Sequence, residues 1–230
     1  MCWSATADLA AGAGIAAVGV ACVAQVRRVG DLPLAALPLL LGAHQIVESV
    51  VWDSGGGGGP ATVAWAVIAL PLLAVWVPVG VVCAAPRHAR RRLALPLVSG
   101  LVTAAALAYA LAARPVTAEI RGHTLGYVVH LSHAEWLIAG YLLATVGALL
   151  LSGDRGMQLL GLLVVVGALI CWALWELEFV STWCAFAAVC SVILWWWVRG
   201  RRRAGPGARG DGRENRPAHS GEDPECRRRM

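Results

Sequence analysis

The chain has 230 residues, of which 58% are hydrophobic and 14% charged, and its mean hydropathy of +0.66 excludes an ordinary soluble domain. Its 19 basic residues are all arginine. The absence of lysine excludes a Schiff base, and with it a retinal-binding pump. The net charge of +5 comes from a few arginine clusters, which indicate membrane topology and not a nucleic-acid surface.

Seven apolar segments follow one another, each close to the roughly 20 residues that a helix needs to cross a bilayer. They span residues 7–26, 32–52, 61–83, 93–113, 134–152, 157–175 and 179–198. We therefore predict an all-α bundle of about seven transmembrane helices over residues 1–198, located in the cell membrane. Residues 199–230 are rich in arginine, glycine, proline and acidic residues, and predict a disordered basic tail.

Arginines mark alternate connections between these segments. They are Arg27 and Arg28, then Arg87, Arg90, Arg91 and Arg92, then Arg155, and finally Arg199, Arg201, Arg202 and Arg203. Because cytoplasmic loops carry the excess of positive charge, we predict an N-terminus outside and a C-terminus in the cytoplasm. The last cluster is expected to contact anionic lipid. On the opposite side, the glycine run 55–59 predicts a flexible hairpin loop.

The second segment ends in polar residues within an apolar stretch. Gln45, Glu48 and Trp52 are three and four residues apart, so on a helix they lie on one face. A carboxylate at the bilayer centre costs roughly 2.5–3.5 kcal/mol on insertion scales, so Glu48 is expected to face other helices. Its role is either structural, paired with Arg114 or Arg121, or functional, and the sequence favours neither.

Further chemically active residues fall on the predicted outer side. The connection 114–133 contains His123, Tyr127, His130 and His133, and the last two segments meet there with Glu176, Trp183 and Cys184. We predict a ligand pocket formed by Gln45, Glu48, Trp52, His123, Tyr127 and Trp183. His123, His130 and His133 are weak candidates for metal ligands, since solvated loop histidines are the commoner explanation. The tryptophans also fit an interfacial aromatic belt.

Cys2 and Cys184 fall on this same side, in an oxidising compartment. A disulfide between them would join the N-terminus to the last helix. The alternatives are two reduced thiols, with Cys184 a small core residue, or removal of Met1, which would leave the amine and thiol of Cys2 as a chelating or nucleophilic pair.

Several strings of residues are shared with a known family. The chain opens Met-Cys-Trp-Ser-Ala-Thr-Ala, and later strings are Leu37-Pro38-Leu39-Leu40, His44-Gln45-Ile46-Val47-Glu48 with Trp52, Gly122-His123 with Tyr127, and Phe179-Val180-Ser181-Thr182-Trp183-Cys184. Up to about residue 198, the chain resembles an uncharacterised family of bacterial multi-span membrane proteins that open Met-Cys-Phe-Ser-Ala-Thr-Ala. The resemblance implies this architecture and a shared set of residues, Cys2, Gln45, Glu48, His123, Trp183 and Cys184, but no substrate.

Three classes of function fit these residues. The outer pocket favours a protein that binds or senses a metal ion, haem or a small lipophilic ligand. The first alternative is a membrane-embedded enzyme of lipid or terpene chemistry, with Glu48 as the acid and Glu176 as a candidate base; small seven-helix terpene cyclases supply only an analogy. A transporter component ranks last, because the two halves show no repeat.

Overall fold

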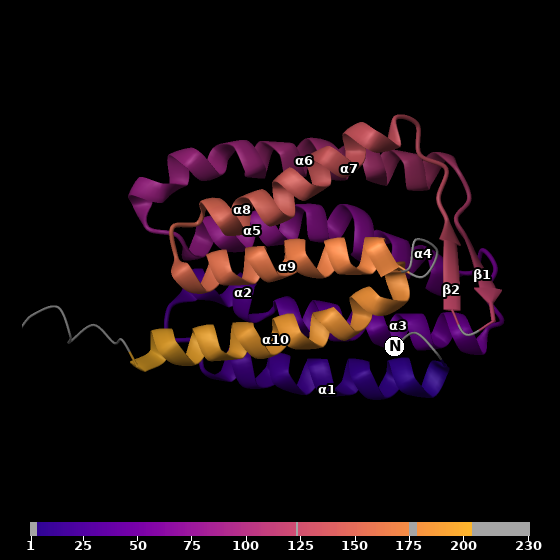
Figure 1. Ribbon diagram of the computed structural model, residues 1–230, viewed down its shortest axis with the longest axis horizontal. Coiled ribbons are helices and arrows are strands. Elements are labelled where there is room, and N and C mark those ends of the chain that lie inside the picture. The colour runs from indigo at the N-terminus through magenta and orange to yellow at the C-terminus, as the bar shows by residue number, and fades with distance from the viewer. Residues whose placement is uncertain (1–3, 123, 175–178, 204–230) are drawn as a thin grey trace, which may run out of the picture.

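The computed structural model describes residues 4–122, 124–174 and 179–203, which form a bundle of long, roughly parallel and antiparallel helices (Figure 1). The helices are α1 (Ala5–Ala24), α2 (Leu32–Ala35), α3 (Leu37–Asp53), α4 (Pro60–Val67), α5 (Leu73–Ala84), α6 (Arg90–Ala113), α7 (Ala134–Leu142), α8 (Ala148–Leu151), α9 (Arg155–Leu174) and α10 (Phe179–Arg203). Short 3-10 turns cover Val29–Asp31 and Arg87–Ala89, and π turns cover Ile68–Leu72 and Leu143–Gly147.

Within the described residues, five continuous helical stretches are long and apolar enough to cross a membrane. They are Ala5–Ala24, Val29–Asp53, Pro60–Ala84, Arg87–Ala113 and Ala134–Leu151, which correspond to the first five predicted segments. The helices α9 and α10 occupy the sixth and seventh predicted segments. The mainly helical architecture with apolar, membrane-length helices is confirmed, whereas the total number of spans and their orientation stay predictions.

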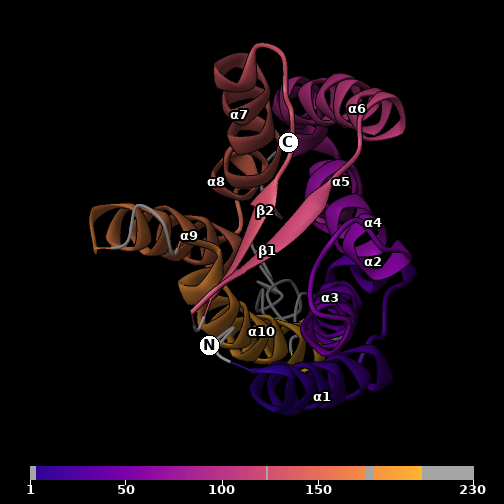
Figure 2. The same ribbon diagram turned by 90° about the vertical axis from the view of Figure 1, so that its right-hand side faces the viewer.

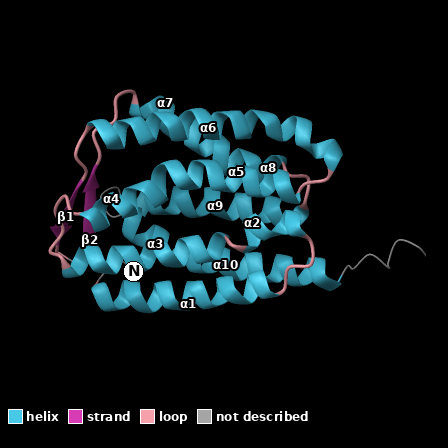
Figure 3. Ribbon diagram, turned by 180° about the vertical axis from the view of Figure 1, so that it is seen from behind, coloured by secondary structure: helices cyan, strands magenta, loops and turns pink. Residues whose placement is uncertain are grey.

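The helices α1 and α3 pack against each other in antiparallel directions (Figure 3). Glycines let the two backbones touch: a Cβ atom on Gly42 would lie 2.8 Å from the carbonyl oxygen of Gly12, and one on Gly12 would lie 2.9 Å from that of Gly42. Small residues at such crossings are the usual means by which membrane helices approach closely. The contact brings the first turns of α1 beside the last turns of α3.

A β-hairpin lies across one end of the bundle (Figure 2). The strands β1 (Thr117–Arg121) and β2 (Thr124–Val128) are antiparallel, with Thr117 opposite Val128 and Arg121 opposite Thr124. Ala118 and Leu125 are buried against Val51 of α3. The sequence predicted only a connecting loop here, so the hairpin is a departure from the predicted all-α class. We call this end of the molecule the hairpin end.

The glycine run is held in place, contrary to the predicted flexible loop. Gly57 and Ala118 exchange both backbone hydrogen bonds, at 2.7 and 3.0 Å, and the hydroxyl of Thr62 donates to the Gly57 carbonyl at 2.8 Å. Gly56 and Gly57 have φ values of +79° and +83°, a region that residues with a Cβ rarely adopt. The run therefore continues the edge of the hairpin, which explains why glycine is required there.

The arginine-bearing connections gather at the opposite end, which we call the arginine end. Arg201 near the end of α10 reaches Asp31, before α2, and Asp154, before α9. It also approaches the carbonyl of Ala84 at the end of α5. The alternate connections identified from the sequence thus lie on one side of the bundle, as the charge pattern requires.

Candidate functional site

Two carboxylates are completely buried near the hairpin end: Asp8 of α1 and Glu48 of α3, each with 0% exposure. They lie close enough to interact electrostatically, because the Gly12–Gly42 contact joins the two helices just beyond them. Oε1 of Glu48 accepts a hydrogen bond of 3.5 Å from the Tyr127 hydroxyl. Neither oxygen of Asp8 accepts a hydrogen bond from any residue that the structure describes. The Trp52 indole is near Asp8 but outside hydrogen-bonding geometry.

Aromatic rings form the wall between these acids and the next helix. Tyr127 stacks on Trp65 of α4, with ring centroids 3.5 Å apart and planes 4° apart. His44 packs against the same indole, with its ring centroid 5.0 Å from that of Trp65. Within the described parts of the chain, Nε2 of His44 and Nε1 of Trp65 are buried without a hydrogen bond. The wall therefore holds polar atoms that a bound molecule could satisfy.

An apolar cavity of about 100 Å³ lies deeper in the bundle. Its lining comes from α3, α5, α9 and α10 and from the region of α7 and α8: Leu37, Leu41, Leu73, Val77, Tyr141, Thr145, Leu149, Leu160, Val164, Phe186, Ala187, Cys190 and Leu194. Leu37, Leu41, His44 and Glu48 recur at intervals of four, three and four residues, so they share one face of α3. This face leads from the cavity to the buried acids.

Two π turns lie next to the cavity lining: Ile68–Leu72 ends directly before Leu73, and Leu143–Gly147 contains Thr145. The first contains Pro71, which cannot donate a backbone hydrogen bond, and the second precedes α8. The Tyr141 hydroxyl donates to the carbonyl of Ala69 at 2.8 Å, and the Thr145 hydroxyl donates to the carbonyl of Tyr141 at 2.8 Å. The polar atoms of both lining residues are thereby satisfied within the protein, so the cavity presents hydrocarbon.

One family model covers most of the chain. The model of a family of unknown function (DUF6629) matches residues 1–209 of the chain. The chain belongs to this family. Neither a curated protein nor a solved structure matches it. Membership of the DUF6629 family confirms the resemblance to an uncharacterised family and assigns no activity, so the function of this family member has to be argued from the site.

Of the predicted pocket, the structure brings together Gln45, Glu48, Trp52 and Tyr127. Glu48 is hydrogen-bonded to Tyr127, and Trp52 packs with Tyr127 against the buried residues of the hairpin. Gln45 is buried, and its Nε2 lies 3.5 Å from Nδ1 of His44. Outside the described residues lie Cys2, His123 and Glu176 and the side chains of Trp183 and Cys184, and with them the proposed disulfide.

Four charged or ionisable residues of the long connection, Arg114, Arg121, His130 and His133, are exposed, unlike the buried acids. No group of three or more potential metal-ligating side chains occurs among the residues that were placed in the structure. Arg121, considered as a partner of Glu48, forms an exposed 2.8 Å ion pair with Glu119.

Sequence reasoning missed Asp8, the hairpin and Trp65. Asp8 is an acid inside the first apolar segment, at the same end as Glu48, and this matching depth was the available signal. Trp65 looked like one more apolar residue of the third segment. Only the pairing of α1 with α3 and of the hairpin with α4 shows that these residues belong to one site.

Proposed function

We propose that this protein binds a small amphiphilic molecule, with the hydrocarbon part in the central cavity and a hydrogen-bond-donating head near Asp8 and Glu48. The observation that carries the proposal is the continuous face of α3. Leu37 and Leu41 line the apolar cavity. Two turns further on, Glu48 lies beside Asp8, whose oxygens accept no hydrogen bond from the residues that the structure describes. A site that is apolar at one end and acidic at the other matches a molecule with the same polarity.

The cavity suits a short hydrocarbon group. Apolar cavities of roughly 150 Å³ stay dry and bind benzene-sized molecules, so the 100 Å³ in this bundle matches a small ring or a few carbons of a chain. Tyr141 and Thr145 present no unsatisfied hydroxyl to this space. Binding there is expected to depend on hydrophobic burial, at about 25 cal/mol per Å² of apolar surface.

The acidic end of the site, at Asp8 and Glu48, suits a hydroxyl or a protonated amine. Buried carboxylates normally have hydrogen-bond donors, and Asp8 has none among the described residues. Tyr127 contacts Glu48, Trp52 lies near Asp8, and Trp65 stacks on Tyr127. Aromatic faces of this kind attract cations. The described residues supply no three-ligand metal site, so among the three predicted ligand classes the lipophilic one has the most support.

Binding can be tested by calorimetry on the full chain in a mild detergent, with octylamine and octanoate as probes. We expect octylamine to bind and octanoate to bind much more weakly, because only the amine donates to Asp8. Leu41→Trp should abolish binding by filling the cavity. Val102→Trp is the matched control, since Val102 is 65% exposed on α6. Equal binding by both probes, or by both variants, would contradict the proposal.

A membrane-embedded enzyme is the second candidate, and the buried acids favour it. Glu48 is 0% exposed, lies beside Asp8 and contacts a phenol. Paired acids in apolar surroundings are a recurrent arrangement for proton transfer. The test is the lipid profile of cells that carry Glu48→Gln in place of the natural protein. An unchanged profile would remove this candidate and leave the binding role.

A further inference from the structure

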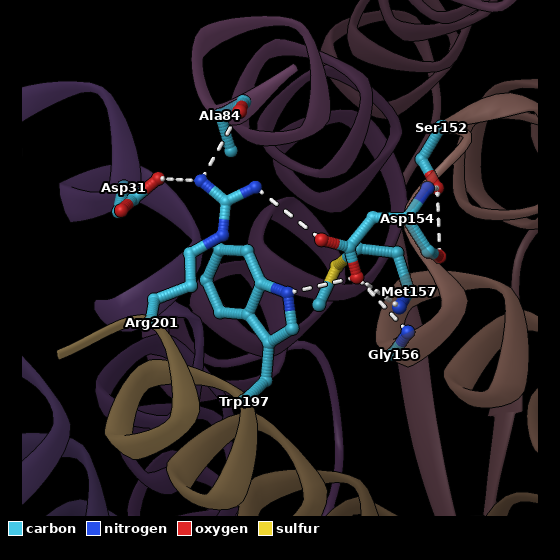
Figure 4. A network of polar contacts seen from close by, with 8 residues as sticks. All are labelled: Asp31, Ala84, Ser152, Asp154, Gly156, Met157, Trp197 and Arg201. Atoms are coloured by element: carbon cyan, nitrogen blue, oxygen red, sulfur yellow. Dashed lines mark hydrogen bonds and ion pairs between the residues drawn. The ribbon is translucent and has the colours of Figure 1, made fainter. Parts of the chain in front are cut away.

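A guanidinium group joins three segments at the arginine end (Figure 4). Nη1 of Arg201 donates to Oδ1 of Asp31 at 2.7 Å, and Nη2 donates to Oδ2 of Asp154 at 3.3 Å. The indole N–H of Trp197 donates to Oδ1 of Asp154 at 3.1 Å, and the guanidinium lies 4.6 Å from the Trp197 ring centroid. Arg201 is therefore occupied by protein partners and fixed in position.

A small pocket of about 20 Å³ opens beside this group, between the end of α1 and the end of α10. Arg27, Arg28 and Arg202 line it together with Arg201 and Asp31. The first three are exposed, and none of them forms an ion pair with a carboxylate in the described part of the chain. Three positive charges without a carboxylate partner among the described residues thus line one hollow, whose wall is held by the Arg201–Asp31 pair.

We propose that this pocket binds the phosphate group of an anionic phospholipid. Guanidinium groups match phosphate in geometry and charge, and they bind it through paired hydrogen bonds. A site that holds one water needs roughly 10–15 Å³, so a single phosphate oxygen enters the pocket. The remaining oxygens stay at the mouth, within reach of the exposed arginines.

The position of the pocket favours a lipid over phosphate in solution. Arg27 and Arg28 follow directly on the apolar helix Ala5–Ala24, so they lie where headgroups meet water. Trp196, 61% exposed on the neighbouring turn of α10, is the kind of side chain that occupies this interface. The sequence predicted a lipid contact for the whole cluster 199–203. Arg201 is engaged with Asp31 and Asp154, and Arg199 packs over Trp195. Of the cluster, we therefore assign the lipid contact in this pocket to Arg202.

Native mass spectrometry of the full chain provides the test, with phosphatidylglycerol, phosphatidylcholine and inorganic phosphate as probes. We expect one tightly held phosphatidylglycerol per chain. The double variant Arg27→Gln/Arg28→Gln should lower its affinity about 10-fold or more, given roughly 1 kcal/mol per arginine near a membrane surface. The matched control is Arg90→Gln/Arg91→Gln, which removes two exposed arginines from the same end but from outside the pocket.

Three results would overturn the proposal. Equal losses in the two double variants would show that general surface charge attracts the lipid. Equal retention of phosphatidylcholine would show that the anionic headgroup is not recognised. Displacement by millimolar inorganic phosphate, without selective retention of phosphatidylglycerol, would assign the pocket to phosphate in solution. Circular dichroism of each variant confirms that the comparison is made on folded protein.

Discussion

Tyr127 and Trp65 stack in parallel, 3.5 Å apart, although one belongs to the hairpin and the other to α4. The stack fixes the hairpin over α3 and α4. It also places the Tyr127 hydroxyl 3.5 Å from Oε1 of Glu48. Tyr127 thereby links the hairpin to the buried Glu48. Its ring contact with Trp65 and its hydroxyl contact with Glu48 can be separated by mutation.

Tyr127→Phe should lower the free energy of unfolding by about 0.5–1.5 kcal/mol, because it removes one hydrogen bond and keeps the stack. Tyr127→Leu should cost about 0.5–1.5 kcal/mol more, because the stack is lost as well. Denaturation in mixed detergent micelles measures both variants. Identical losses for the two variants would show that the ring contributes nothing beyond its hydroxyl.

Asp8→Leu should stabilise the ligand-free protein by about 1–3 kcal/mol, because a buried carboxyl that has no hydrogen-bond partner among the described residues is replaced by an apolar group of similar size. The same variant should lose octylamine binding. Unfolding and calorimetry on one preparation check both parts. A destabilised Asp8→Leu protein would mean that the acid has a structural partner, and the head-group assignment would fail.

Gly42→Ala should destabilise the fold by about 1–3 kcal/mol, because the added methyl group meets the backbone of α1. Gly14→Ala is the control, since apart from its own helix backbone and chain neighbours no described atom lies within 4 Å of its Cβ position. This control should be neutral or more stable by up to about 1 kcal/mol, given the helix propensity of alanine. Similar losses in both variants would show that Gly42 is not a close contact.

Gly56→Ala should loosen the hairpin. Its φ is +79°, and a Cβ there would lie 2.6 Å from the Ala118 carbonyl oxygen, so a cost of about 1–2 kcal/mol is expected. Gly59→Ala, in an extended backbone with open space around it, should have little effect. Hydrogen exchange at the Ala118 amide reports on the contact, and equal protection in both variants would contradict the prediction.

Asp31 and Arg201 should show a coupling energy of about 1–3 kcal/mol in a double-mutant cycle, because their 2.7 Å pair is largely shielded from water. The cycle uses Asp31→Asn and Arg201→Gln, with unfolding as the readout. Arg203→Gln replaces Arg201→Gln in the control cycle, since Arg203 is exposed. A coupling near zero would mean that Asp154 alone holds the guanidinium.

The lengths of the apolar segments were sufficient to predict the helices, because membrane-length apolar segments have few alternative structures. Glu48 stood out for the same reason. The hairpin was not predictable in this way, because its strands are five residues long and stabilised by contacts with Gly57 and Val51 far away in the sequence. Asp8 became part of the site only through the approach of α1 to α3, which composition does not reveal.

The two π turns determine which side of the following helices, α5 and α8, faces the cavity. A π turn holds one residue more than the α turn it replaces, and one residue corresponds to about 100° of rotation. Loss of a single residue between Ile68 and Leu72 would turn Leu73 and Val77 away from the central space. Family members that have one residue more or fewer at either turn should therefore keep the same helices but bind ligands of a different shape in the central cavity.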